Sequence, residues 1–76
     1  MKIGSILKKI GGINRDVIYW WEARGFISPE RVKRGKVDRR EYNDKDFQMI
    51  KAMWQFYSQG ITPKIAYEKA LEYLRN

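Results

Sequence analysis

The sequence has 76 residues and a formal net charge of +7, from 16 Lys and Arg against nine Asp and Glu, and it contains neither cysteine nor histidine. This length limits the chain to one small domain, and the missing cysteine and histidine exclude disulfides, thiolate metal sites and the commonest general base. The basic excess favours a polyanionic partner over an enzyme active site, and we expect no cofactor and no metal.

The first part of the chain predicts two helices joined by a glycine turn. The apolar residues of the first helix recur at helical spacing, at Ile3, Ile6, Leu7 and Ile10. Gly11-Gly12 would end that helix, Asn14 suits the N-cap of the next one, and Gly25 suits its C-terminal end. The buried side of the second helix would consist of Val17, Ile18 and Trp21. Residues 3–25 therefore fit a helix-turn-helix.

A basic hairpin is predicted next, over residues 27–42. Gly35 marks a turn between a strand at Arg31–Lys33 and another at Val37–Tyr42. Six of the ten residues from 31 to 40 are basic, and one acidic residue opposes them. A disordered loop is the alternative. The ribbon is favoured because apolar contacts are available from Val32, Val37 and Tyr42.

Two more helices are predicted, over residues 44–75. Asn43 is a favourable N-cap for a helix at 44–59, and Thr62-Pro63 would open the last helix. The polar half of the longer helix would comprise Gln48, Lys51, Ala52, Gln55, Ser58 and Gln59. The main apolar side of the last helix would comprise Tyr67, Ala70, Leu71 and Leu74. Three further residues would lie away from that side, either on other elements or on a contact surface: Ile65, Ala66 and Tyr73.

Taken in this order, the elements resemble the DNA-binding domain of the MerR family of transcription regulators. Residues Ile18-Tyr19-Trp20-Trp21-Glu22 and Gly25-Phe26-Ile27-Ser28-Pro29 are similar to the family's I-R-Y-Y-E and G-L-L-S-P segments. Arg39–Asn43, Asp46-Phe47 and Gly60-Ile61-Thr62 resemble its Y-R-x-Y-S, D-L and G-F-S segments. The resemblance covers nearly the whole chain. It implies a single winged helix-turn-helix domain over residues 1–76, mainly α with a small β-ribbon wing and four helices.

The sequence departs from the family pattern at positions that affect which DNA sequence the protein would read. Tyr19 replaces the arginine of the recognition helix, and Asp16 lies where a basic or hydroxyl residue is common. Gly11-Gly12 adds one residue to the usual turn, and the wing is about two residues longer. Family members typically continue into a dimerisation helix and an effector domain, and neither occurs within these 76 residues. We therefore expect no small-molecule effector within this chain.

The resemblance implies that the second helix lies in the major groove of DNA, where base edges are distinct. Arg15 is the first candidate for a base or phosphate contact. Asp16 either accepts from a cytosine amino group or serves the helix dipole. Tyr19 is a candidate for a phosphate or a thymine methyl. Trp20 either donates to a phosphate or belongs to the core.

The wing is expected to lie along the DNA backbone or in the adjacent minor groove, where its contacts supply affinity. Arg31 and Arg40 occupy the family's arginine positions, and Arg24 is expected to contact a phosphate or to lie near Glu22. The candidate DNA-binding residues are Asn14, Arg15, Asp16, Tyr19, Trp20, Arg24, Arg31, Lys33, Arg34, Lys36, Arg39 and Arg40.

The expected partner is double-stranded DNA. One domain of this size offers few base contacts, so we expect a homodimer or tandem copies on DNA, held together through helix 44–59 or the last helix. Two other functions stay open: a small excisionase-like or phage architectural protein that bends DNA, and a basic protein-interaction module of a larger regulator. The sequence shows no membrane-spanning run and no signal peptide, and it suggests a cytoplasmic, nucleoid-associated protein of bacterial or phage origin.

Overall fold

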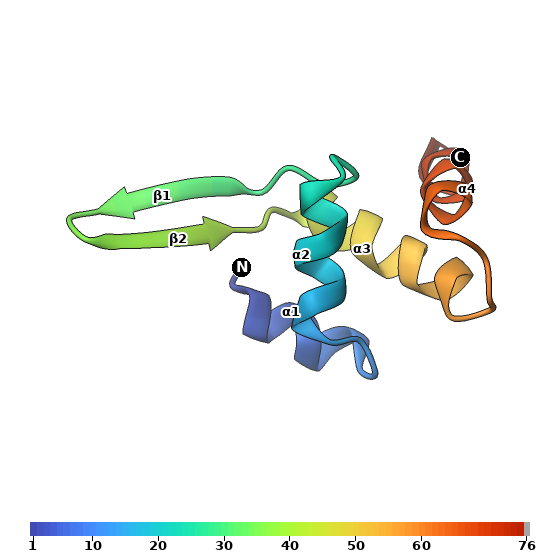
Figure 1. Cartoon of the computed structure of the whole chain (residues 1–76), viewed down its shortest axis with the longest axis horizontal. Coiled ribbons are helices and arrows are strands. Elements are labelled where there is room, and N and C mark those ends of the chain that lie inside the picture. Colours follow the sequence, from blue (N-terminus) through green and yellow to red (C-terminus); the bar gives the residue numbers. More distant parts are fainter. Residues whose placement is uncertain (76) are drawn as a thin grey trace.

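The computed structural model describes residues 1–75 and contains four helices and one antiparallel hairpin. In chain order these are α1 (Ile3–Ile10), α2 (Arg15–Ala23), β1 (Glu30–Arg34), β2 (Val37–Glu41), α3 (Asp44–Tyr57) and α4 (Pro63–Arg75). The hairpin projects from the helical body on the side away from α4 (Figure 1). No described helix combines the length and apolarity that crossing a bilayer requires. The expected winged helix-turn-helix is confirmed, while Asn76 lies outside the described residues.

Helix α2 is fixed at both ends by the residues that the sequence singled out. The Asn14 side chain accepts a hydrogen bond from the Val17 amide at 3.1 Å. At the other end Gly25 adopts a φ of +82°, a conformation that favours glycine. The amides of Gly25 and Phe26 then donate to carbonyls three and five residues earlier, which closes the helix in a Schellman motif. The local sequence alone therefore sets where α2 starts and stops.

The core lies beneath α2, between α1 and α3. The largest fully buried side chains are Trp21, Tyr42, Ile6, Ile18, Ile50 and Met53. The Trp21 ring packs edge-on against Tyr57 with 5.7 Å between centroids. The prediction that Trp21 belongs to the core is confirmed, and Ile13 is buried just before α2.

The packing of α3 against α4 differs in detail from the sequence prediction. Ala52, assigned to the polar half of its helix, is buried, and so is Ala66, which was placed away from the apolar side of α4. Leu71 and Leu74 are instead 41% and 39% exposed. We attribute this to close packing: α3 and α4 meet along small side chains, among them Ala70, so the larger leucines fall at the edge of the contact.

The start of α3 is capped more completely than expected. The Asn43 side chain accepts from the Asp46 amide at 2.8 Å, and the Asp46 carboxylate accepts from the Asn43 amide at 3.1 Å. This reciprocal capping box satisfies two amides that would otherwise lack a partner. The helix ends at Tyr57 rather than at residue 59, and a turn leads to Gly60, whose φ is +93°.

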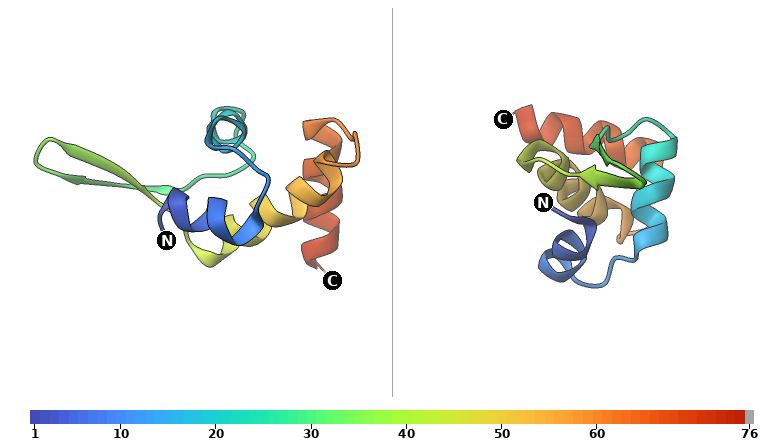
Figure 2. Two further views of the ribbon diagram at one scale, coloured as in Figure 1. Left: turned by 90° about the horizontal axis from the view of Figure 1, so that it is seen from below. Right: turned by 90° about the vertical axis from the view of Figure 1, so that its left-hand side faces the viewer.

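The hairpin forms the wing and defines the long axis of a molecule that measures 40 × 24 × 20 Å. Its cross-strand pairs are Glu30↔Glu41, Arg31↔Arg40, Val32↔Arg39, Lys33↔Asp38 and Arg34↔Val37. In the left view of Figure 2 it is a thin ribbon that extends beyond the helices. Tyr42, expected as the end of the second strand, leaves the ribbon and enters the core, and its amide donates to the Met1 carbonyl at 2.9 Å. The base of the wing is thereby joined to the start of α1.

We expect Tyr42 to make the fold sensitive to alkaline pH. Its hydroxyl is buried without a hydrogen-bond partner among residues 1–75, and burial raises the pKa of Tyr42 to about 12. In the unfolded chain a tyrosine ionises near pH 10. The free energy of unfolding should therefore fall as the pH rises from about 10 to about 12, where only the unfolded chain gains this charge.

The variant Tyr42→Phe isolates this contribution, which urea titrations monitored by circular dichroism would measure. Near neutral pH it should be as stable as the wild type or more stable by about 1 kcal/mol, because an unpaired buried hydroxyl is costly. Its stability should decline less than that of the wild type between about pH 10 and 12. Parallel declines in the two proteins would contradict this assignment.

Candidate nucleic-acid interface

The outward face of α2 carries the candidate DNA-contact residues that the sequence assigned to the second helix, except Tyr19, which is half-buried. Ile18 and Trp21 bury the inner face, so the side chains on the opposite face point away from the core. The exposed residues on and next to α2 are Asn14, Arg15, Asp16, Trp20, Ala23 and Arg24. In the left view of Figure 2, α2 is seen nearly end-on and stands out from the layer that contains α1 and α3. The helix therefore offers an accessible face of charged and aromatic groups.

Trp20 and Arg24 form a stacked pair on this face. Trp20 is 41% exposed, which places it at the surface rather than in the core. The guanidinium carbon of Arg24 lies 4.1 Å from the centroid of the Trp20 ring, a cation–π contact between residues one helical turn apart. Among the described residues no ion pair joins Arg24 to Glu22, since residues two positions apart on a helix do not face each other.

The register of the wing separates its charged residues into two faces. Residues that pair across an antiparallel ribbon share a face, and neighbours along a strand alternate between faces. The face toward α2 carries the pairs Arg31↔Arg40 and Lys33↔Asp38. The other face carries a mixed set with two apolar residues: Glu30, Val32, Arg34, Val37, Arg39 and Glu41.

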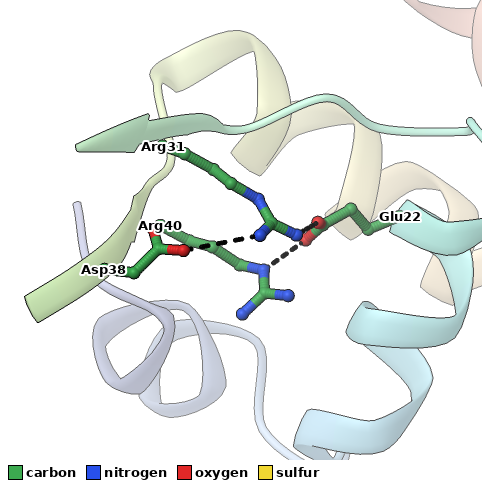
Figure 3. A network of polar contacts seen from close by, with 4 residues as sticks. All are labelled: Glu22, Arg31, Asp38 and Arg40. Carbon is green, nitrogen blue, oxygen red and sulfur yellow. Dashed lines mark hydrogen bonds and ion pairs between the residues drawn. The ribbon is translucent and has the colours of Figure 1, made fainter. Parts of the chain in front are cut away.

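Glu22 of α2 holds both strands of the wing at its base, as Figure 3 shows. Its Oε1 accepts from Arg40 Nε at 2.6 Å, and its Oε2 accepts from Arg31 Nη2 at 3.1 Å. Asp38 lies 3.6 Å from the other terminal nitrogen of Arg31. Glu22, Arg31, Asp38 and Arg40 are called the Glu22 cluster below. The cluster joins α2 to the wing by charge-assisted hydrogen bonds.

Arg40 is the most constrained member of the Glu22 cluster. Its guanidinium carbon lies 4.5 Å from the centroid of the Tyr19 ring, so the group is placed between Tyr19 and Glu22. Burial disfavours its charge, but the hydrogen bond and the charge of Glu22 outweigh burial and raise the pKa of Arg40. Tyr19 is half-buried in this contact, whereas the sequence analysis treated it as a side chain that contacts a phosphate or a thymine methyl.

The other basic residues of the wing remain exposed. Among the described residues no ion pair engages Lys33, Arg34, Lys36 or Arg39. The structure thus divides six basic wing residues into two that are paired with carboxylates and four that are not. Sequence reasoning missed Glu22 as a site residue. The available signal was the helical spacing, since a residue three positions after Tyr19 lies on the same side of the helix.

Comparison with known proteins agrees with this geometry. The family model described as "MerR HTH family regulatory protein" matches residues 1–70. No curated protein and no solved structure gives a significant match to the chain. The family match spans most of the sequence, and the helix-turn-helix, wing and helix pair occur in the order that the resemblance implied. The chain therefore belongs to the MerR family of helix-turn-helix regulatory proteins, whose domains of this type bind DNA.

Proposed function

We propose that this chain is a single DNA-binding domain that places α2 in the major groove of a duplex and the wing along the flanking backbone or minor groove. The observation that carries the proposal is the pairing of two features. One face of α2 is anchored by buried Ile18 and Trp21 while the other stays accessible, and a cationic hairpin is joined to the same helix through Glu22. A helix fits the major groove, and cationic side chains beside it suit the phosphates.

In this proposal the first turn of α2 contacts bases, and the C-terminal end of α2 contacts the phosphate backbone. Arg15 is exposed in the first turn and is our first candidate for a base contact, with guanine as its best partner. Asp16 is placed to accept from a cytosine amino group or to complement the helix dipole. The stacked pair of Trp20 and Arg24 suits a phosphate, since both the indole N–H and the guanidinium donate hydrogen bonds. Tyr19, whose ring lies against Arg40, stays our candidate for a phosphate or a thymine methyl.

The wing supplies affinity in this proposal. Lys33, Arg34, Lys36 and Arg39 are exposed, and we propose that they neutralise phosphates, whereas Arg31 and Arg40 lie at the base of the wing. Phosphate contacts position a protein on DNA without reading its sequence. Sequence preference should therefore depend on α2 and salt sensitivity on the wing.

We also propose that two copies bind together on DNA. The apolar side of α3 is largely used in the core, since Ile50 and Met53 are fully buried. An exposed apolar set remains on α4: Ile65, Leu71, Tyr73 and Leu74. Of the two surfaces considered from the sequence, α4 is the one still available. Analytical ultracentrifugation of the protein with a DNA duplex that it binds would test this proposal. A strictly 1:1 complex at every concentration would reject it.

Selection of bound duplexes from a random pool tests the proposed function. We expect an enriched motif for the wild type and, at one position, relaxed preference for Arg15→Ala, because a bidentate arginine–guanine contact contributes ~1–3 kcal/mol of discrimination. Lys51→Ala, an exposed change on α3 that removes the same charge, should leave the motif intact. Recovery of no motif from the wild type would reject sequence-specific binding.

A further inference from the structure

The Glu22 cluster resolves a charge conflict in the wing. Arg31 and Arg40 are directly paired across the two strands, so two cations face each other on one side of the ribbon. Like charges at such a pair destabilise a hairpin, and a two-stranded ribbon is marginal even without them. The Glu22 carboxylate accepts from both, one oxygen to each guanidinium. The carboxylate that accepts from both arginines comes from α2, whereas Asp38 of the wing forms an ion pair with Arg31 alone.

We propose that Glu22 is a positioning residue that sets the direction of the wing relative to α2, and that Arg31 and Arg40 act mainly as its partners rather than as phosphate contacts. This inference rests on the proposed function only where it concerns DNA. The Glu22 side chain is 15% exposed, so both arginines donate to a partly shielded carboxylate. Most other residues of the two strands are exposed, so few other contacts hold the wing in place.

The Glu22 cluster also connects the wing to the face of α2 that we propose contacts bases. Tyr19 and Glu22 lie three residues apart on one side of α2, and Arg40 contacts both. A displaced Arg40 would therefore release the Tyr19 ring as well as the ribbon. Because the wing and the helix must fit one duplex together, loss of the cluster should weaken binding even though no group that contacts DNA is removed.

The sign of this effect separates positioning from simple electrostatics. Removing a negative charge from a basic DNA-binding surface should by itself strengthen binding. Glu22→Gln should instead weaken it by about three- to tenfold, the size expected for partly exposed charge-assisted hydrogen bonds. Glu30→Gln is the matched control, since it removes the same charge from the base of the wing, and among the described residues the Glu30 carboxylate forms no ion pair. It should leave binding unchanged or strengthen it.

The first measurement uses the free protein and does not depend on DNA. Heteronuclear NOE values of the amides in residues 30–41 should fall in Glu22→Gln and in Arg40→Gln, while the helices keep their chemical shifts. Glu30→Gln should leave these values at the wild-type level. Unchanged wing order in both cluster variants would overturn the proposal, whatever the protein binds.

The second measurement is a double-mutant cycle on the affinity for the selected duplex. If Arg40 acts through Glu22, the double variant Glu22→Gln/Arg40→Gln should bind no more weakly than the weaker single variant. Additive losses, or tighter binding by Glu22→Gln equal to that of Glu30→Gln, would overturn the proposal. Failure of the wild type to bind any duplex would reject the proposed function, and the NOE comparison would still decide the role of Glu22.

Discussion

Replacing Trp21 with alanine is expected to remove about 3–5 kcal/mol of the free energy of unfolding at 25 °C. The side chain is fully buried at the back of α2 and packs against Tyr57 of α3, so the change would open a large cavity where the two helices meet. Trp→Ala substitutions in cores cost about 3–5 kcal/mol. Small domains have only about 0.05–0.15 kcal/mol of stability per residue, and this one has 76. The free energy of unfolding is therefore about 4–11 kcal/mol, and the loss ranges from about a quarter of it to all of it.

The neighbouring tryptophan provides the control for this prediction. Trp20 is 41% exposed, and Trp20→Ala should cost less than about 1 kcal/mol because it leaves the core intact. Circular dichroism during urea titration measures both variants without depending on the altered fluorophore. Equal destabilisation by the two substitutions would contradict the orientation of α2, because each face of the helix would then contribute equally to the core.

Local signals in the sequence were sufficient to predict the elements of the fold. Asn14, Gly25 and Asn43 cap or close helices through hydrogen bonds to nearby amides and carbonyls, so their effect is visible within a few residues of sequence. The same holds for the turn of the wing at Gly35, whose φ is +62°. The family resemblance then placed these elements in order, the structure has them in that order, and the family model matches residues 1–70.

Long-range packing was harder to predict from the sequence. Hydropathy and helical spacing assigned Leu71 and Leu74 to the buried side of α4, yet the buried line runs through Ala66 and Ala70. Side-chain volume explains this difference: alanines let two helices approach closely, and only the structure shows which faces meet. The identity of the family does not supply this information, because it follows from the packing of this chain.

The candidate interface, too, could be predicted only in part from the sequence. The sequence identified the basic stretch, but charge counting treats six wing cations as equivalent. Cross-strand register and the reach of Glu22 distinguish two of them, Arg31 and Arg40, from the rest. The cross-strand pairing of Arg31 with Arg40 and the hydrogen bonds of Glu22 both join residues at least nine positions apart in the chain. Helical spacing could place Glu22 on the side of Tyr19, but it could not show that Glu22 reaches Arg31 and Arg40 of the wing.

Neutralising the four unpaired wing cations is expected to abolish most of the salt dependence of DNA binding. The variant carries Lys33→Gln, Arg34→Gln, Lys36→Gln and Arg39→Gln. Each phosphate contact adds about 0.9 to the slope of log K against log salt, so four contacts account for about 3.6 of a wild-type slope near −4 to −5. A fourfold rise in salt, from about 50 to 200 mM, should weaken the wild type by hundreds of times and the variant by less than about tenfold.

A second variant with the same net charge separates local contacts from general attraction. It carries Lys45→Gln, Lys51→Gln, Lys64→Gln and Lys69→Gln, all exposed positions on α3 and α4, and it also lowers the net charge from +7 by four. Fluorescence anisotropy over a salt series should give this variant a slope close to that of the wild type, because condensed counterions are released where cations meet phosphates. Equal loss of slope in the two variants would mean that overall charge, rather than the wing, attracts the duplex. A loss confined to the wing variant would support binding along the exposed ribbon and leave sequence preference to α2.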